Sequence, residues 1–505
     1  RLAPVAPALV KDTAGYYVPG SQPAAARVDT PQPPSVRPGV AQGQFVNLGA
    51  FVHAGVLDLR GATAGNSLVM TSRPTANGPA GTGMFVSEGG TLLVNAAFGA
   101  EGSTGVADVL AVDGTRRGQA ATTIVVDRRE GPGMATADNG ILVVDVRNPA
   151  ASDANAFTLQ GDYVREDRPF IIRGARAYGL YFNGVGQADR DGRWYLRDTA
   201  VAPTVPVYSS YPLALQALID LPTLRQRASQ GGAPWPDAAN SAARPDFNSH
   251  PTANGSVWMR TKAGHARQQL DLSNGKATAD ADLYVLQVGR DWTLSSTPRN
   301  LVQGGLNLQY GHVSSQVRSP EGSGRVRASG YGAGATLTWY SARGFYTDLQ
   351  AQLVRTEGDI HSATTGSPLI KNNRGLGHAA SIEAGMPLAL TPHWRITPQA
   401  QLLYSKIRFD PFTDPYGAKV ASTQGKDTRL RLGLDLAYRP DGSDTHSPQR
   451  GLAYHGGLNL YRTLRGSKTV GITNEQFSSA VEHTLAGLDI GVHYTRDDRI
   501  SAYAE

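Results

Sequence analysis

Cysteine is absent from this sequence, and so is any long apolar run. Without cysteine the chain can form neither disulfide cross-links nor thiolate metal sites, and this composition suits a chain that crosses an oxidising compartment before it folds. A membrane-spanning helix needs about 18 or more consecutive apolar residues, so the sequence excludes transmembrane helices. It begins with Arg1 and shows no charged and then apolar signal segment, so we expect a processed or cut N-terminus.

Concentrated positive charge is missing as well. The formal net charge is +6 over 505 residues, but the lysines and arginines are scattered among aspartates and glutamates without a basic block. Proteins that bind nucleic acid gather their cations on one face or stripe. We therefore expect a mixed, solvated surface and no nucleic-acid partner.

The common catalytic and cofactor motifs are not found either. The sequence has no His-Glu-x-x-His, no Gly-x-Ser-x-Gly and no Walker lysine loop, and its 11 histidines are scattered. The segment Asp189-Arg-Asp-Gly192 is short of the remaining ligands and the closing glutamate of a calcium loop. We expect no catalytic residue, cofactor or metal in this chain. If the full-length protein is an enzyme, its active site lies upstream of Arg1.

The second half of the chain is rich in alternating β-strand patterns. In Arg429–Tyr438, leucines and a final tyrosine alternate with mostly polar or small residues. The stretches Phe345–Leu353, Arg395–Tyr404 and Leu485–Tyr494 follow the same rule. Because successive side chains of a strand leave opposite faces, each stretch predicts a strand with one apolar and one polar face.

These strands suit a membrane barrel better than a soluble sandwich. At roughly 10–15 residues they exceed the usual strand of about 5–6 and can cross a bilayer at a tilt. Their apolar faces often end in aromatic residues, as a girdle at the membrane surface would, and their polar faces repeatedly carry charge. A globular core would not tolerate so many charges. A soluble β-domain remains the alternative.

We expect eleven strands, some of which are joined by long loops at Arg408–Asp427 and Thr463–Glu482. Single-chain bacterial barrels use even strand numbers, and an open sheet in lipid would leave backbone groups unpaired. We therefore expect a 12-stranded antiparallel transmembrane β-barrel whose last strands are missing from a truncated C-terminus. The predicted strands are 257–268, 283–294, 301–315, 326–340, 345–357, 376–388, 394–407, 429–438, 452–462, 485–495 and 500–505.

The first half divides into three further segments. Residues 1–44 are rich in proline and alanine and predict a linker or the remnant of an upstream region. Residues 45–199 contain apolar runs of three to six residues separated by turn signals such as Asn139-Gly140. Such spacing favours a right-handed parallel β-helix stem, with a β-sandwich as the alternative. Residues 200–250 form a connector, and residues 251–505 the barrel.

The connector contains a helical pattern. Leu213, Ala217, Leu218, Leu221 and Leu224 recur at helical spacing, and Pro222 breaks this helix or starts a second one. This predicts either a surface helix or a helix in the barrel lumen, where Arg225 and Arg227 would meet charged side chains of the wall. We expect the lumen contacts to come from the following residues: Arg225, Arg227, Arg260, Asp348, Glu383, Arg395, Arg429, Arg431, Asp435 and Asp489.

From about Gly49 to Glu505 the chain resembles the C-terminal half of a pertactin-like autotransporter, a type V secretion protein. The resemblance rests on segments in the family's order, among them Asp108–Gly114 with Trp194–Leu196, Val205–Pro212, Val257–Arg260 and Phe409–Gly417. It departs from the family at Glu505, where an aromatic residue usually ends the barrel. Residues 211–232 also contain no asparagine for passenger cleavage.

The resemblance implies an outer-membrane translocator that secretes and displays its own N-terminal passenger, an adhesin or other surface factor. It implies a Gram-negative outer membrane with the stem at the cell surface, and as partners the membrane lipid, the barrel-assembly machinery and an unidentified ligand of the passenger. Two other hypotheses stay open from the sequence. One is a porin or transporter barrel with an accessory β-domain, and the other is a soluble secreted β-protein.

Overall fold

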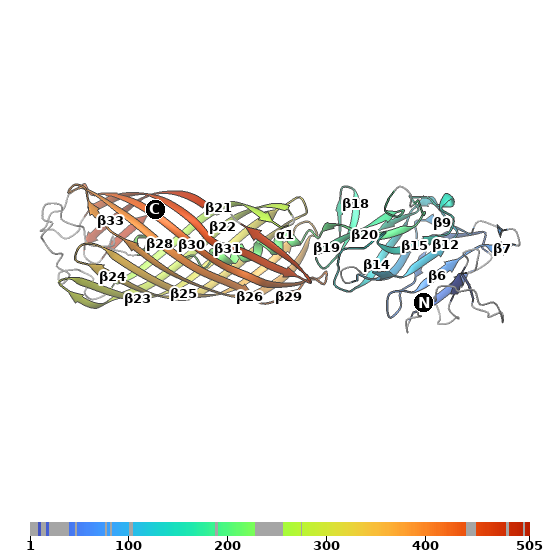
Figure 1. Cartoon of the computed structure of the whole chain (residues 1–505), viewed down its shortest axis with the longest axis horizontal. Coiled ribbons are helices and arrows are strands. Elements are labelled where there is room, and N and C mark those ends of the chain that lie inside the picture. The colour runs from blue at the N-terminus through green and yellow to red at the C-terminus, as the bar shows by residue number, and fades with distance from the viewer. Residues whose placement is uncertain are drawn as a thin grey trace. The chain divides into compact units, whose positions relative to one another are not determined.

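The computed structural model describes residues 9–11, 17–19, 40–45, 48–75, 78–80, 83–99, 105–186, 190–227, 256–273, 275–440, 451–480, 484–497 and 500–505. The chain divides into two compact units, labelled by element in Figure 1. The first contains the described residues up to Pro203 with Thr413–Lys419 and Ile472–Glu475. The second contains Thr204–Phe412, Val420–Gly471 and Gln476–Glu505.

The first unit is built on three parallel β-ladders. The chain visits the ladders in the same order three times, through β3–β4–β5, then β6–β9–β10, then β12–β13–β14. β15 and β16 then extend the first and third ladders. The strands are β3 (Gln42–Phe45), β4 (Ala50–His53), β5 (Val56–Asp58), β6 (Ser67–Met70), β9 (Met84–Glu88), β10 (Thr91–Ala97), β12 (Val109–Val112), β13 (Gly114–Ala120), β14 (Thr122–Glu130), β15 (Ile141–Val146) and β16 (Phe157–Leu159).

The register of these ladders places similar side chains next to one another on adjacent strands. Leu92 pairs with Ile124, which pairs with Leu159, and all three are buried. Leu110 likewise lies between Leu68 and Val144 in the first ladder. Each short run is too small to form a core alone, so burial depends on its neighbours in the stack.

Two buried polar residues fasten turns and strands of this unit. The Asp108 carboxylate accepts three backbone N–H bonds, from Gly65 (2.9 Å), Asn66 (2.8 Å) and Asn95 (2.7 Å). Burial nevertheless raises the pKa of Asp108 above its ordinary value. His53 packs its ring against Phe85 at 5.4 Å, with Nδ1 3.2 Å from Thr122 Oγ1. Burial lowers the pKa of this imidazole.

The parallel pattern ends before the predicted boundary at residue 199. β17 (Tyr163–Arg165), β18 (Arg168–Arg173), β19 (Arg176–Phe182) and β20 (Trp194–Val201) are antiparallel, and β20 pairs antiparallel with β15. The expectation of parallel rungs is wrong for this stretch. The cause is local, because Glu166 and Asp167 both have positive φ (50° and 62°) in a two-residue turn. Such a turn makes a hairpin and leaves no length for a parallel crossover.

The other short elements of the first part of the chain lie around these ladders. They are β1 (Leu9–Lys11), β2 (Tyr17–Pro19), β7 (Arg73–Thr75), β8 (Gly78–Ala80), β11 (Val106–Ala107) and η1 (Pro149–Ala151). Most of predicted segment 1–44, and residues 228–250 of the connector, lie outside the described residues.

Two helices open the second unit, α1 (Val205–Ala217) and α2 (Leu224–Arg227). The predicted break near Pro222 separates them, but α1 begins eight residues before Leu213, where the apolar pattern begins, and contains Pro212. Pro206 occupies the first turn of α1, where its missing N–H is not needed. Among the described residues, no helix is long and apolar enough to span a bilayer.

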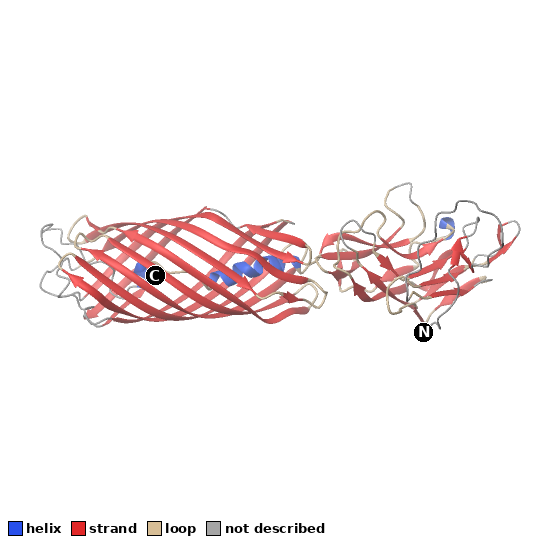
Figure 2. Ribbon diagram, turned by 60° about the horizontal axis from the view of Figure 1, so that its bottom comes forward, coloured by secondary structure: helices blue, strands red, loops and turns tan. Residues whose placement is uncertain are grey.

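The rest of the second unit is a closed antiparallel barrel, and Figure 2 shows the helices inside it. The ring contains ten strands, and it closes through pairing of β30 with β31 and of β32 with β21. The ring strands are β21 (Ser256–Leu272), β22 (Gly275–Thr297), β23 (Asn300–Arg318), β24 (Ser323–Ser341), β25 (Tyr346–Ser362), β26 (Ser367–Gly385), β28 (Trp394–Phe409), β30 (Lys419–Tyr438), β31 (Gly451–Ile472) and β32 (Glu475–Ala480).

Four further strands complete the sheet: β27 (Leu388–Ala389), β29 (Phe412–Thr413), β33 (Thr484–Asp497) and β34 (Ile500–Ala504). β33 pairs with β31, and β34 pairs with β33. These two strands correspond to the predicted strands 485–495 and 500–505. The expected barrel had twelve strands with the last ones missing, whereas the described ring closes with ten, because the end of β21 bonds to β32 through Leu272 and Ser479. Closure gives backbone groups partners inside the sheet, as a bilayer requires.

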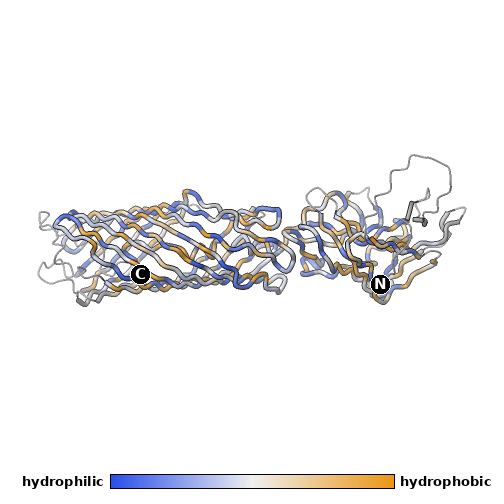
Figure 3. The backbone as a smooth tube through the Cα atoms, turned by 90° about the horizontal axis from the view of Figure 1, so that it is seen from below, coloured by the Kyte–Doolittle hydropathy of each residue, from blue (hydrophilic) through white to orange (hydrophobic). Residues whose placement is uncertain are grey.

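The two faces of the wall differ as the alternation predicts. On β25, Asp348, Gln350 and Gln352 are buried, whereas Leu349 and Leu353 are about half exposed on the outer face. The apolar residues of β30 and β33 are exposed in the same way, and Figure 3 shows hydrophilic and hydrophobic residues alternating along the strands. The barrel therefore presents apolar groups outward and polar groups to its interior, the reverse of a soluble sandwich.

The strands are longer than the apolar pattern indicates. β22 spans 23 residues, and β28–β30 and β31–β32 extend into the stretches expected as long loops. Those two loop predictions are wrong. Strand pairing is made by backbone hydrogen bonds, which continue past the last lipid-facing leucine, whereas the hydrophobic pattern stops there.

Candidate functional site

The barrel lumen is the candidate site. Apolar contacts with the wall hold α1 inside it. Val207, Tyr208, Tyr211 and Leu215 are fully buried on the helix. The Tyr211 ring lies 4.9 Å from that of Phe409 on β28, and its hydroxyl lies 3.2 Å from Asn373 Oδ1. Because the helix is apolar nearly all round, it needs a wall on every side, as a helix buried in a core does.

Glycines of the wall make room for this helix. A Cβ at Gly324 would lie 2.7 Å from Val207, and one at Gly377 would lie 2.6 Å from Ile219. A methyl group at Gly358 would overlap the Tyr211 hydroxyl. The close approach of helix and wall therefore requires glycine at these inward-facing positions.

Arg227 on α2 is the most buried ionic anchor of the lumen. Its Nη2 lies 2.5 Å from Asp348 Oδ1, and its Nη1 lies 3.4 Å from Asp291 Oδ1. Thr336 and Thr338 accept further bonds from the same guanidinium at 3.3 and 3.0 Å. Arg227 and Asp348 are 3% and 0% exposed. A charge pair at this depth needs such extra hydrogen bonds to offset the loss of hydration.

Arg225 makes the second set of ionic contacts between α2 and the wall. Its Nη2 lies 2.6 Å from Asp489, its Nη1 3.3 Å from Glu505 and its Nε 3.6 Å from Asp435. His455, Asp489 and Glu505 have ligand atoms within 4.8 Å of one another and could in principle hold a cation. The guanidinium already supplies positive charge to the two carboxylates. Asp189 of the weak calcium-like segment lies outside the described residues.

The other predicted lumen residues contact the wall or the turn between the helices. Glu383 accepts the Leu224 N–H at 3.2 Å and lies 3.3 Å from Arg431, rather than pairing with an arginine of α2. Arg260 donates to Gln287 at 3.0 Å. Arg395 lies on β28 within electrostatic reach of Asp435. Arg429 is 3.8 Å from Asp220 and 3.4 Å from Asp427.

A row of buried glutamines binds the main chain between the helices. Gln309 Nε2 donates to the Leu218 carbonyl at 2.8 Å, and Gln350 Nε2 donates to the Pro222 carbonyl at 2.8 Å. Gln401 Nε2 reaches the same Pro222 oxygen at 3.4 Å. Breaking a helix leaves carbonyls without intrahelical partners, and these amides supply the missing bonds.

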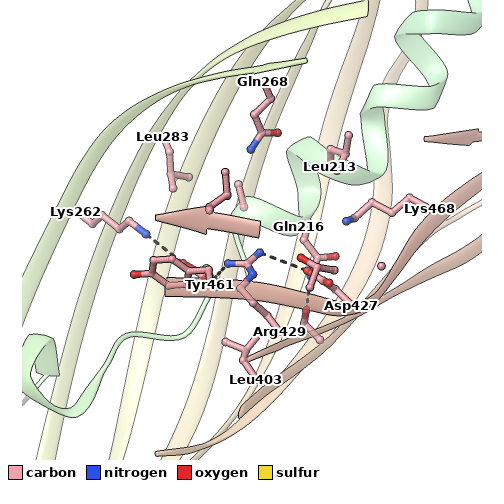
Figure 4. A pocket seen from close by; sticks show the side chains of 16 residues that line it. Leu213, Gln216, Lys262, Gln268, Leu283, Leu403, Asp427, Arg429, Tyr461 and Lys468 are labelled. Carbon is pink, nitrogen blue, oxygen red and sulfur yellow. Dashed lines mark hydrogen bonds and ion pairs between the residues drawn. The ribbon is translucent and has the colours of Figure 1, made fainter. Parts of the chain in front are cut away.

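A cavity of about 360 Å³ lies beside α1. Figure 4 shows Lys262, Arg429 and Lys468 on the wall facing the helix residues Leu213 and Gln216. Gln216 donates to Ser405, and Lys262 Nζ lies 3.3 Å from Asp220. The helix therefore fills the lumen incompletely on this side and leaves a space lined by both charged and apolar side chains.

Sequence reasoning did not find several of these partners. Asp291, Thr336 and the lumen glutamines lie on polar strand faces that carry no motif, and only their register brings them to the linker. The alternation did place Gln350 on the inner face, which was the one available signal. Which residue meets Arg225 or Arg227 depends on strand stagger and helix depth.

The geometry defines a class: an antiparallel membrane barrel whose own chain occupies its lumen. Comparison with known families then gives the relationship. Residues 257–505 match the family profile "Autotransporter beta-domain", and residues 80–171 match "Autochaperone Domain Type 1". The chain therefore belongs to the autotransporters, and the predicted resemblance is confirmed.

Curated relatives agree with this placement. The chain is 34% identical over 440 residues to the adhesin BmaC autotransporter of Brucella suis, an alignment that covers 84% of this chain and 12% of that protein. It is 28% identical to the pertactin autotransporter of Bordetella bronchiseptica over 37% of this chain and 20% of that protein. It thus spans a small part of its relatives.

Among solved structures, the transport unit of AIDA-I from Escherichia coli aligns at 15% identity and a TM-score of 0.45, covering 57% of this chain and 88% of that one. The family and the barrel place the protein in a Gram-negative outer membrane.

Proposed function

We propose that the barrel carries the polypeptide preceding Val205 through the outer membrane and then retains it at the cell surface. The observation that carries this proposal is the linker, which runs inside the lumen and is bound there through Arg227 and Asp348. A segment that runs through the lumen and is fixed at its end suits a chain that has just been exported. The lumen residues predicted from the sequence would bind the linker once export is complete.

We further infer that the three parallel ladders are the faces of a right-handed β-helix. The repeated order of the ladders supports a coil, and crossovers between parallel strands are right-handed in nearly all proteins. Folding of this stem outside the cell would disfavour backsliding into the lumen. The free energy of folding of the stem would thereby favour movement of the chain outward.

The passenger would be a surface factor, with adhesion favoured by the name of the BmaC relative. We expect no enzymatic activity in this chain. Its partners would be the outer-membrane lipid, the barrel-assembly machinery that inserts the strands, and a surface ligand of the passenger. Twelve strands remain our prediction for the wall, because β33 and β34 follow the ten strands of the ring and keep the total even.

The test is surface display by the full-length protein in outer membranes. A protease added to intact cells should cut the 45–199 stem, while the barrel keeps its faster, heat-modifiable migration on a gel. Protection of the stem in intact cells, with cleavage after the outer membrane is opened, would contradict export.

The porin alternative predicts another result. A porin conducts ions with its chain intact, whereas an occupied lumen should show little conductance in planar bilayers. High conductance of the intact protein would favour the porin. Extraction into buffer without detergent would favour a soluble protein.

A further inference from the structure

Positively charged side chains gather on the outer face of the barrel, at one edge of its apolar band. Along β28 the outward series runs Leu402, Tyr404, Lys406 and Arg408, so lipid-facing groups give way to cations within one strand. Lys426 on the adjacent β30 is exposed at the same height, since it pairs in register with Lys406. The cluster defined by Lys406, Arg408 and Lys426 is called the rim cluster below.

The rim cluster contains an unfavourable arrangement. Lys406 and Lys426 lie directly opposite each other on neighbouring strands, and His378 lies opposite Lys406 on its other side. Like charges directly opposite in a sheet destabilise the pairing. Among the described residues, the rim cluster forms no ion pair. An anion between the two ammonium groups would turn the repulsion into attraction.

The position of the rim cluster indicates which anion fits. Tyr404 is exposed just below Lys406, and its ring lies 6.1 Å from that of His378. Aromatic residues of membrane barrels mark the boundary between hydrocarbon and headgroups. Cations immediately beyond that boundary lie at the level of lipid phosphates, and basic sites at this depth bind lipid headgroups.

The edge in question is the one at which the linker enters the barrel. Phe409, next to Arg408, contacts Tyr211 near the start of the linker. Under the proposed topology the chain before Val205 is outside the cell, so this edge meets the outer leaflet.

We propose that the rim cluster binds the phosphate groups of a phosphorylated glycolipid in the outer leaflet. The two lysines flank one phosphate as point charges, and Arg408, one step further along the strand, donates a forked pair of N–H bonds. The acyl chains lie along Leu402 and Tyr404. This site goes beyond export, and it rests on the proposed topology only for the choice of leaflet.

The test uses purified full-length protein in detergent with three probes: bisphosphorylated lipid A, dephosphorylated lipid A and inorganic phosphate. The readouts are the lipid retained per barrel by mass and the temperature at which heat-modifiable migration is lost. Bisphosphorylated lipid A should be retained and should raise that temperature, whereas the other two probes should not.

The double variant K406Q/K426Q gives the sharper comparison. Retention of bisphosphorylated lipid A should fall about ten-fold, the size expected when charge-assisted hydrogen bonds are lost. Without lipid the variant should melt at a higher temperature than wild type, because the like-charge pair is gone. A merely structural role for the lysines predicts a lower one.

The matched control is R267Q/R318Q, which removes the same charge from two exposed arginines that already lie beside Asp280. It should retain lipid as wild type does. Equal retention of both lipids, equal stabilisation by inorganic phosphate, or unchanged retention by K406Q/K426Q would each overturn the site. Surface proteolysis of the stem is a separate measurement, so failure here leaves the export proposal standing.

Discussion

Arg227 shows how much one side chain can contribute inside the lumen. Replacing it with methionine would leave Asp348, which is 0% exposed, without its cation. Removing one partner of a buried pair typically costs about 3–5 kcal/mol. We expect R227M to lower the temperature at which heat-modifiable migration is lost and to raise conductance.

Two comparisons separate charge from packing in that experiment. R227M/D348N removes the closest charge pair but leaves Asp291 without the guanidinium that lies 3.4 Å from it, so the double variant should recover only part of the lost stability. R225M should cost less, because Arg225 is 22% exposed and solvent screens its contacts. An equal loss in R225M and R227M would show that depth of burial does not govern these pairs.

His53 predicts a pH dependence of the stem. Its pKa in the folded state is lowered from the ordinary 6.5 by burial, so the unfolded state binds more protons between the two values. The free energy of unfolding of the stem should therefore fall as the pH drops through about 6.5 toward the lowered pKa. Denaturant unfolding at pH 7.5 and 5.5 measures this change.

The variant H53F is the control for that pH series, since phenylalanine retains the packing on Phe51 and Phe85 but has no proton to gain. Its difference from wild type should shrink or reverse at pH 5.5. Asp108 has the opposite tendency, because its raised pKa stabilises the stem as the pH falls, but it is present in both proteins. A parallel decline in both would exclude His53 as the cause.

At the level of elements, the fit of α1 to the wall depends on glycine. In G358A, the new methyl group would force the Tyr211 hydroxyl away from Asn373, to which it donates at 3.2 Å. We expect a less stable barrel with more frequent channel openings. The loss should be about 1–3 kcal/mol, as for other overpacked sites.

The double variant G358A/Y211F tests the stated cause. Removing the hydroxyl takes away the nearest atom that the methyl group would meet, while a ring carbon at 2.8 Å remains, so the double variant should regain part of the stability lost in G358A. Additive losses would mean that the alanine acts through the strand rather than through the helix.

The sequence predicts those elements whose pattern follows directly from geometry. The alternation in Phe345–Leu353 was sufficient to assign its two faces, because a strand has a side-chain period of two. The start of α1 was not predictable, because Pro212 disfavours a helix interior and only burial in the lumen overrides this. The hairpin turn at Glu166 and Asp167 was missed because positive φ is uncommon in residues other than glycine.

The residues of the lumen site also fall into those that the sequence predicts and those that it does not. Arg225 and Arg227 were identifiable as charges that need partners near a polar lumen. Gln309 and Thr336 were not, because neutral side chains carry no signal until the register of the sheet places them next to the linker.

For the molecule as a whole, the linker should determine permeability. Deleting residues 204–227 from the full-length protein removes α1, α2 and every lumen contact that they make. Single channels should then appear in planar bilayers, while the intact protein stays near background. If the deleted form still migrates as a folded barrel but does not conduct, then something besides the linker closes the lumen.

The length of the strands has a practical consequence. β25 has 17 residues, about 56 Å along the strand and about 40 Å of height at a tilt of about 45°, against an apolar band of about 25 Å. Its outward residues beyond Leu353 are Arg355, Glu357, Asp359 and His361. A detergent belt would therefore leave a collar of rigid sheet uncovered. Antibody fragments raised against that collar would bind a part of the molecule that is fixed by the sheet rather than loops. Such fragments would be suitable markers for imaging a protein of this size.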